Sequence, residues 1–132
     1  MTPVNPAFVS PVLRGRYRCA NVRPLRMGNT GGMPITHTVV FRLAHAPGSP
    51  EETAFLDDAW RALTSIPGVE DFRISRQVSA MSDLVFQFAM VFADQAAYDA
   101  YDGHPTHVAF VAERWVPEVA AFQEYDFVAL RA

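Results

Sequence analysis

The segment from Tyr101 to Phe110, with the sequence YDGHPTHVAF, holds the densest group of side chains capable of acid–base chemistry. His104 and His107 lie on either side of Pro105, and Tyr101 lies just upstream. Histidine has an unperturbed pKa of about 6.5, so it can give or take a proton near neutral pH. A histidine close to a phenol predicts a site for general acid–base chemistry.

His107 has two interpretations. Pro105 is a good first residue for a helix, and His107 would then share a face with Phe110, Val111 and Arg114. It is either a general base in a cavity between helix and sheet, or a buried structural histidine. In the second case its ring bonds a backbone carbonyl or Tyr101.

The positions of the other three histidines are predicted from their neighbours in the sequence. His104 precedes Pro105, which disfavours helical geometry and predicts a cap or turn residue. His37 alternates with apolar residues, so it is either a polar wall of a pocket or a strand end half in water. His45 is predicted to be solvated. The Tyr101 hydroxyl either orients a substrate carbonyl and relays a proton or lies at the surface.

Other aromatic and acidic residues are weaker candidates. Tyr98 is predicted to lie in the core or at its rim, and Trp60 and Trp115 to supply hydrophobic bulk. A zinc site needs three or four ligands, and only Glu113 and Asp102 could join the histidines. We therefore predict no metal.

Composition restricts the class of protein. The chain has 132 residues, half of them hydrophobic, which suits one globular domain. A net charge of −3 argues against a nucleic-acid partner, and no apolar run approaches the ~20 residues needed to cross a membrane. The single cysteine and the absence of a signal-like leader predict a cytoplasmic protein.

Residues 1–33 differ from the rest. They carry five arginines and no acid, with four prolines and a glycine-rich end, whereas residues 34–132 carry six arginines and all fourteen acids. We expect an extension that is disordered or arises from a wrongly assigned start. The alternatives are a basic arm for an acidic partner or nucleic acid, and a strap that packs on a partner subunit.

From residue 34 the pattern predicts β-α-β-β-α-β. Strands are expected at 35–43, 69–78, 84–92 and 119–130. The first helix begins at Ser49 with a capping box to Glu52, and its apolar stripe runs to Ile66. The second helical region is capped by Asp94, breaks at Gly103 and restarts at Pro105 to about Trp115. This order predicts an α+β, ferredoxin-like fold with a four-stranded antiparallel sheet.

The predicted sheet has two apolar faces but helices for only one of them. Val85, Ala89 and Val91 point to the other face, so a second copy of the chain is expected to cover it. Two such sheets would close a dimeric α/β barrel. We predict a homodimer.

Residues 34–130 resemble the stress-responsive A/B barrel family, a group of dimeric α+β barrels. The matching pieces are HTVVF at 37–41, IPGV at 66–69, the turn from Tyr101 to Phe110, and EYDF at 124–127. In a plant polyketide cyclase of this family, a histidine of this turn is the base and a tyrosine assists it. The resemblance implies those roles for His107 and Tyr101, and a pocket position for His37. A middle-strand histidine of that cyclase is replaced by Phe86.

The function predicted from these observations is binding of a small apolar carbonyl compound, with His107 as a possible general base of cyclase or lyase type and no cofactor. The predicted ligand-binding residues are His37, Phe41, Phe86, Phe88, Phe110 and Trp60. Two alternatives stay open. One is a non-catalytic stress-response dimer, and the other is a haem- or quinone-type monooxygenase inferred from fold analogy.

Overall fold

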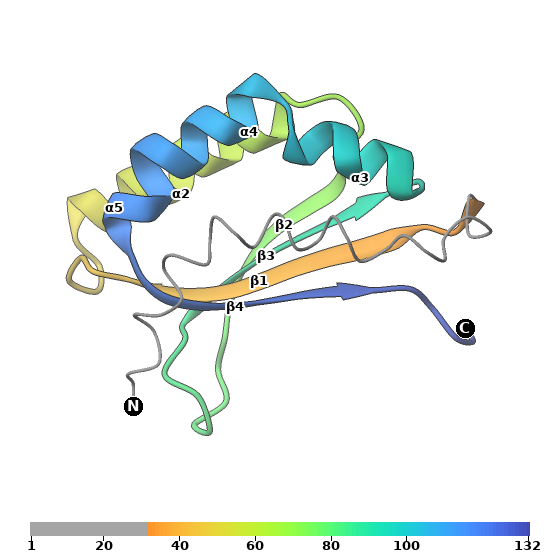
Figure 1. Cartoon of the computed structure of the whole chain (residues 1–132). Coiled ribbons are helices and arrows are strands. Elements are labelled where there is room, and N and C mark those ends of the chain that lie inside the picture. The colour runs from red at the N-terminus through yellow and green to blue at the C-terminus, as the bar shows by residue number, and fades with distance from the viewer. Residues whose placement is uncertain (1–31) are drawn as a thin grey trace.

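In the part of the chain that the structure describes, four antiparallel strands form one sheet, and the helices lie on one side of it (Figure 1). The computed structural model describes residues 32–132. The strands are β1 (Ile35–Leu43), β2 (Glu70–Arg76), β3 (Phe86–Phe92) and β4 (Val119–Phe127), in the order β2-β3-β1-β4. The helices are α2 (Pro50–Thr64), α3 (Gln95–Asp102), α4 (Pro105–Phe110) and α5 (Val116–Glu118).

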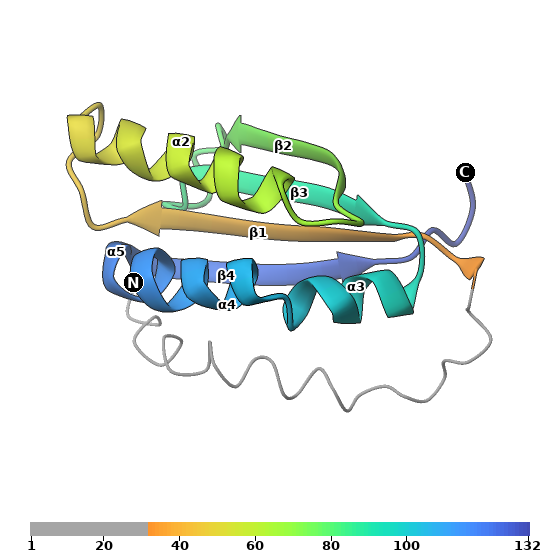
Figure 2. The same cartoon turned by 90° about the horizontal axis from the view of Figure 1, so that it is seen from above.

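This arrangement confirms the ferredoxin-like α+β prediction. Figure 2 shows α2 above β2 and β3, and the row formed by α3, α4 and α5 above β1 and β4. Three of the strands are shorter than expected: β2 lacks 69, 77 and 78, β3 begins at Phe86, and β4 ends at Phe127. The extension predicted for residues 1–33 falls outside the described residues except for its last two positions.

The first helix begins as its sequence predicts. The Ser49 hydroxyl accepts a hydrogen bond from the Glu52 amide at 3.2 Å, and Pro50 occupies the first turn. The Glu52 carboxylate accepts from the Gly48 amide at 2.9 Å rather than from Ser49, so the expected capping box is shifted by one residue. The helix ends at Thr64, and Ile66 is buried just beyond it.

The last helical region differs from the prediction. Instead of one α-helix from Pro105 to Trp115, α4 continues into a π-helical segment, η2 (Val111–Trp115), in which the Val116 amide bonds the Val111 carbonyl. A π turn returns to the same face after about five residues. Phe110 and Trp115, five positions apart, therefore both point into the core and are buried.

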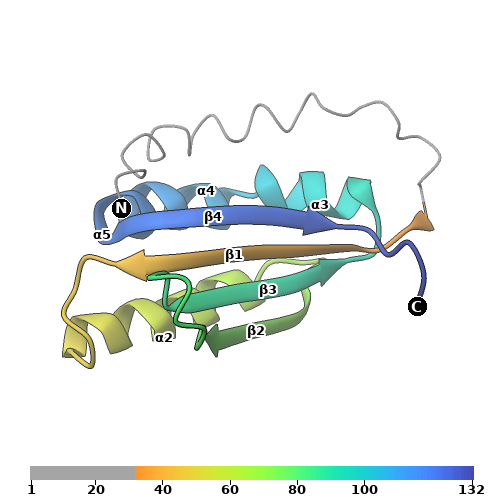
Figure 3. The ribbon, with the colours of Figure 1, turned by 90° about the horizontal axis from the view of Figure 1, so that it is seen from below.

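The core lies between the sheet and the helices. Alternate residues of β1 and β3 point toward the helices, as the alternation of buried and partly buried residues predicts. At the centre the ring centroid of Phe41 lies 4.6 Å from that of Phe88 and 5.0 Å from that of Trp115. No helix formed by residues 32–132 lies over the opposite face of the sheet (Figure 3).

Candidate functional site

His37 lies on the helix-facing side of β1 and forms the centre of a polar cluster. Only 5% of the residue is exposed. Its Nδ1 is 2.7 Å from the Asp126 carboxylate, and its Nε2 is 3.6 Å from the Glu124 carboxylate. Both acids lie on β4, where Asp126 pairs directly with His37 in the sheet register. Of the two positions left open by the sequence, the structure shows the buried one.

Tyr98 completes this cluster from α3. Its hydroxyl lies 2.9 Å from each Asp126 carboxylate oxygen and 2.9 Å from His37 Nδ1. The helix is started by Asp94, whose side chain accepts from the Ala97 amide, so the first turn of α3 is fixed beside the sheet. Tyr98 was expected only as a core or rim residue, and the sequence reasoning missed this role.

The pKa values reflect burial and the nearby acids. Burial alone would lower the pKa of His37, but the hydrogen bond and charge of Asp126, with Glu124 and Asp102, raise it overall. Burial and the same three carboxylates raise the pKa of Tyr98 far above its ordinary value. His37 therefore tends to hold its proton, and Tyr98 stays a neutral phenol.

Tyr101 lies beside this cluster and is 3% exposed. The residue as a whole is therefore buried, where the sequence had left open a role in the site or a hydroxyl at the surface. Its ring centroid is 4.4 Å from that of His107, 6.2 Å from that of His37 and 4.9 Å from that of Phe92. Within residues 32–132 no group hydrogen-bonds the Tyr101 hydroxyl, and burial with the charges of Asp102 and Glu124 raises its pKa.

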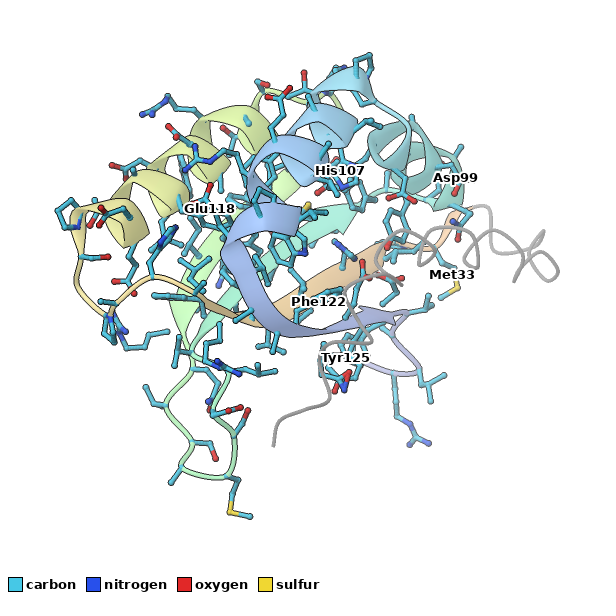
Figure 4. All side chains as sticks on the ribbon, turned by 60° about the vertical axis from the view of Figure 1, so that its left-hand side comes forward. Met33, Asp99, His107, Glu118, Phe122 and Tyr125 are labelled. Atoms are coloured by element: carbon cyan, nitrogen blue, oxygen red, sulfur yellow. The ribbon has the colours of Figure 1, made fainter. Side chains whose placement is uncertain are left out.

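His107 is partly buried at the junction of α3 and α4. Figure 4 shows it in the helical layer, above the strand β4 that carries Phe122 and Tyr125. Its Nδ1 is 3.0 Å from the Asp102 carbonyl oxygen. Because a carbonyl only accepts, Nδ1 carries a proton in this geometry. Its neighbour His104 is the predicted cap, since its Nδ1 accepts from the Thr106 amide.

The predicted apolar residues lie in two different environments. Phe41, Phe86 and Phe88 pack against one another in the core, and Phe110 lies 5.5 Å from Phe55 in the same core. Trp60 instead is 49% exposed on α2 and packs edge-on against Phe72. The structure thus groups His37, Tyr101 and His107, and places Trp60 in a separate contact.

A second polar cluster lies at the other end of the helices. The Glu118 carboxylate contacts His45 Nε2 at 2.7 Å and Arg114 Nε at 2.5 Å, and Arg114 also contacts Asp58. The prediction that His45 is solvated is wrong, because its side chain is only 25% exposed and paired. These contacts join α2, η2 and α5, so we regard this cluster as structural.

The described chain offers little for a metal ion or a membrane. Within residues 32–132 no group of three or more histidine, cysteine, aspartate or glutamate side chains has the arrangement of a metal site. Over the same range no helix is both long enough and apolar enough to span a bilayer.

The fold and the cluster around His37 define a ferredoxin-like α+β domain with a histidine–tyrosine–carboxylate site between sheet and helices. Residues 35–129 match the sequence model described as the stress responsive A/B barrel domain, so the chain belongs to that family. The resemblance inferred from the sequence is thereby confirmed. A search of curated proteins gave no match.

Three solved structures illustrate the similarity. A Dabb family protein from Mesorhizobium loti with a ferredoxin-like fold is 55% identical, with a TM-score of 0.74 over 75% of this chain and 99% of that one. A dimeric ferredoxin-like protein of unknown function from Thermobifida fusca is 20% identical, with a TM-score of 0.60 over 74% and 92%. The hydroxynitrile lyase of Passiflora edulis is 11% identical, with a TM-score of 0.66 over 76% and 97%. The last two show the fold alone.

Proposed function

We propose that this protein binds a small carbonyl compound at Tyr101 and that His107 acts as a general base on it without a cofactor. The observation that carries the proposal is the position of Tyr101, a residue that is 3% exposed and whose ring centroid lies 4.4 Å from that of His107 and 6.2 Å from that of His37. A phenol hydroxyl beside two imidazoles can donate a hydrogen bond to a ligand oxygen.

The position of His107 suits a base. Its Nδ1–H donates to the Asp102 carbonyl, which fixes the ring, and its imidazole lies beside Tyr101. His37 is less suited, because its ring nitrogens face Asp126 and Glu124 and its raised pKa favours the protonated form. The two histidines therefore have different roles, and His37 holds Asp126 and Tyr98 in place.

Tyr101 supports the same chemistry as a hydrogen-bond donor. Its raised pKa keeps the phenol protonated through the neutral range, so it can donate to a carbonyl oxygen. When His107 removes a proton from the adjacent carbon, negative charge develops on that oxygen, and a donor already in place stabilises it. This is proton abstraction of lyase or cyclase type, and a lyase shares the fold.

Exchange of α-protons tests the proposal without knowledge of the natural substrate. The full chain is incubated with acetophenone in deuterium oxide, and deuteration of the methyl group is followed by NMR. His107→Asn should slow protein-dependent exchange by about 100-fold or more. His104→Asn is the matched control, because asparagine can keep the cap at that position. Equal exchange in wild type and folded His107→Asn would contradict the role of His107.

A non-catalytic dimer is the second candidate, and two observations favour it. His107 bonds a backbone carbonyl, as a structural histidine would. Phe41, Phe86 and Phe88 are almost fully buried and pack against one another, so the centre of the interior is filled. For this candidate neither wild type nor variant accelerates exchange, and His107→Asn changes stability alone.

We also propose that the protein is a homodimer joined through the open face of the sheet. Tyr125 and Phe127 point to that face, are 47% and 55% exposed, and stack on each other with centroids 6.0 Å apart. Val91 lies on the same face. A neighbour with the same fold is described as dimeric. Burial of these side chains against a second copy would stabilise the pair.

A further inference from the structure

The loop between β2 and β3, residues 77–85, projects from the side of the sheet that faces away from the helices. Figure 1 shows it as the green loop below the sheet, and Figure 3 shows it on the near side. Asp83 of the loop lies 3.7 Å from Arg42 Nε on β1. Arg42 points to the open face, because the preceding residue Phe41 points into the core. The loop therefore borders the open face.

Side chains within the loop hold it in shape. The Gln77 side-chain amide donates to the Leu84 carbonyl at 2.7 Å, and its oxygen accepts from the Ser79 amide. The hydroxyls of Ser79 and Ser82 accept from the amides of Met81 and Leu84, each at 3.1 Å. A loop that is fixed before it binds loses less conformational entropy when a partner covers it.

The end of this loop carries an apolar tip, which consists of Val78 and Met81. Val78 is 86% exposed and Met81 is 93% exposed. A methionine side chain is flexible and polarisable, so it adapts to an irregular apolar or aromatic surface. The tip therefore has the chemistry of a contact for aromatic side chains.

The apolar tip and the aromatic pair Tyr125 and Phe127 belong to diagonally opposite corners of the sheet. Strands β2 and β4 are its two edges. The loop precedes Phe86, which pairs with Phe41 near the end of β1, whereas Phe127 pairs with Thr36 near its start. A two-fold axis between two facing sheets can therefore bring each tip onto the aromatic pair of the other copy. The same contact then forms twice, as in an isologous interface.

Arg42 is a second indication that a partner covers this part of the face. Its Nε is buried, and residues 32–132 give it no hydrogen-bond partner, since Asp83 at 3.7 Å is too distant. Buried donors are nearly always hydrogen-bonded. An acceptor on a second copy lying over Arg42 would complete this bond.

The charges at the two corners are complementary. Asp83 is the one charged residue of the loop, and its side chain is 69% exposed. Arg131 follows Phe127 in the C-terminal segment and is exposed. When the tip of one copy meets the aromatic pair of the other, these opposite charges are brought to the same end of the interface, which favours this arrangement.

We propose that residues 77–85 form an arm that packs its apolar tip against the aromatic pair of a second copy of this chain. The inference rests on the proposed homodimer and identifies which segment of each chain holds the other. It does not depend on the proposed chemistry at His107, because that residue lies on the helical side of the sheet.

Cross-linking between two single-cysteine variants tests the contact directly. One full-length chain carries Met81→Cys and the other Phe127→Cys, and both carry Cys19→Ser because Cys19 is the one native cysteine. The two proteins are mixed, allowed to exchange subunits and treated with a short bismaleimide. We expect mass spectrometry to show a link between positions 81 and 127. A link only between two copies of position 81, or no link in protein of doubled mass, would overturn the arm and leave the homodimer intact.

Dilution followed by light scattering measures how much the arm contributes. Met81→Asp should raise the dissociation constant of the dimer by about tenfold or more, because a buried methionine is replaced by a charge. Val108→Asp is the control, since it puts the same charge at a 53% exposed residue of α4 and should leave the constant unchanged. Equal constants for wild type and Met81→Asp would remove the arm from the interface. A wild-type protein with a single chain mass would show that the homodimer itself is wrong, and the arm would fail with it.

Discussion

Tyr98 and Tyr101 are one helical turn apart on α3, yet their hydroxyls have different surroundings. Tyr98 contacts both oxygens of Asp126 and the His37 ring, whereas no residue from 32 to 132 hydrogen-bonds the Tyr101 hydroxyl. A hydroxyl that is already bonded contributes to folding. A hydroxyl that no residue from 32 to 132 hydrogen-bonds is instead available to a ligand.

Removal of each hydroxyl should therefore have a different effect. Tyr98→Phe should lower the free energy of unfolding by about 1 kcal/mol, because Asp126 and His37 lose a partner in a partly exposed site. Tyr101→Phe should change it little and should instead reduce binding of acetophenone. Urea denaturation of both variants measures the difference. Equal losses of stability would show that the two hydroxyls have the same structural role.

His37 should make stability depend on pH above neutrality. Its pKa is raised in the folded protein, so its contribution to stability is fully present below the unfolded value of about 6.5 and is lost as pH rises through the folded value. The free energy of unfolding should fall between pH 6 and pH 8.5 more steeply for wild type than for His37→Gln. Parallel curves for the two proteins would exclude His37 as the source. Tyr98 and Tyr101 do not interfere, since their pKa values are raised above the ordinary 10.

At the scale of the elements, the sequence predicted helix starts and strand faces well. Ser49, Asp94 and His104 each cap the helix that their position suggests, because capping is a local interaction. The partners of His37 were missed for the opposite reason. Asp126 lies 89 positions away, and only the pairing of β1 with β4 brings it beside the histidine.

The π-helical segment is a second feature that depends on tertiary contacts and could not be predicted from the sequence. The sequence from Pro105 to Trp115 contains nothing that breaks an α-helix, and an uninterrupted helix was the natural prediction. The structure instead widens one turn, so that Phe110 and Trp115 both reach the core. In this geometry Phe110 packs against Phe55 and Trp115 against Phe41, and such tertiary contacts are not visible in local spacing.

The cap of α3 should support the site directly. The Asp94 side chain accepts from the Ala97 amide at 2.9 Å at the start of the helix that carries Tyr98 and Tyr101. Asp94→Ala should cost about 1 kcal/mol of stability. It should also speed amide hydrogen exchange in α3. Ser49→Ala is the control, because it removes the cap of α2 and should speed exchange there instead. Unchanged exchange in α3 of Asp94→Ala would show that packing alone holds this helix.

At the scale of the whole molecule, the open face of the sheet is the feature that a single chain leaves unexplained. The helices cover the side that bears His37, and Tyr125 and Phe127 stack on the other side with about half of each residue exposed (Figure 3). Adjacent exposed aromatic side chains are typical of an interface. Because the candidate site lies on the opposite side of the sheet, assembly and ligand binding can be changed separately.

Substitution on the open face should therefore separate the subunits without affecting the site. Light scattering of the wild-type protein should give twice the chain mass of 14.7 kDa. Tyr125→Asp with Phe127→Asp should shift it toward one chain mass, because a symmetric interface places each new charge opposite the same apolar patch. Val116→Asp, which changes a 43% exposed residue on the helical side, should leave the mass doubled. A wild-type protein with a single chain mass would remove the homodimer. The open face would then need a different partner, since its aromatic pair would still be exposed.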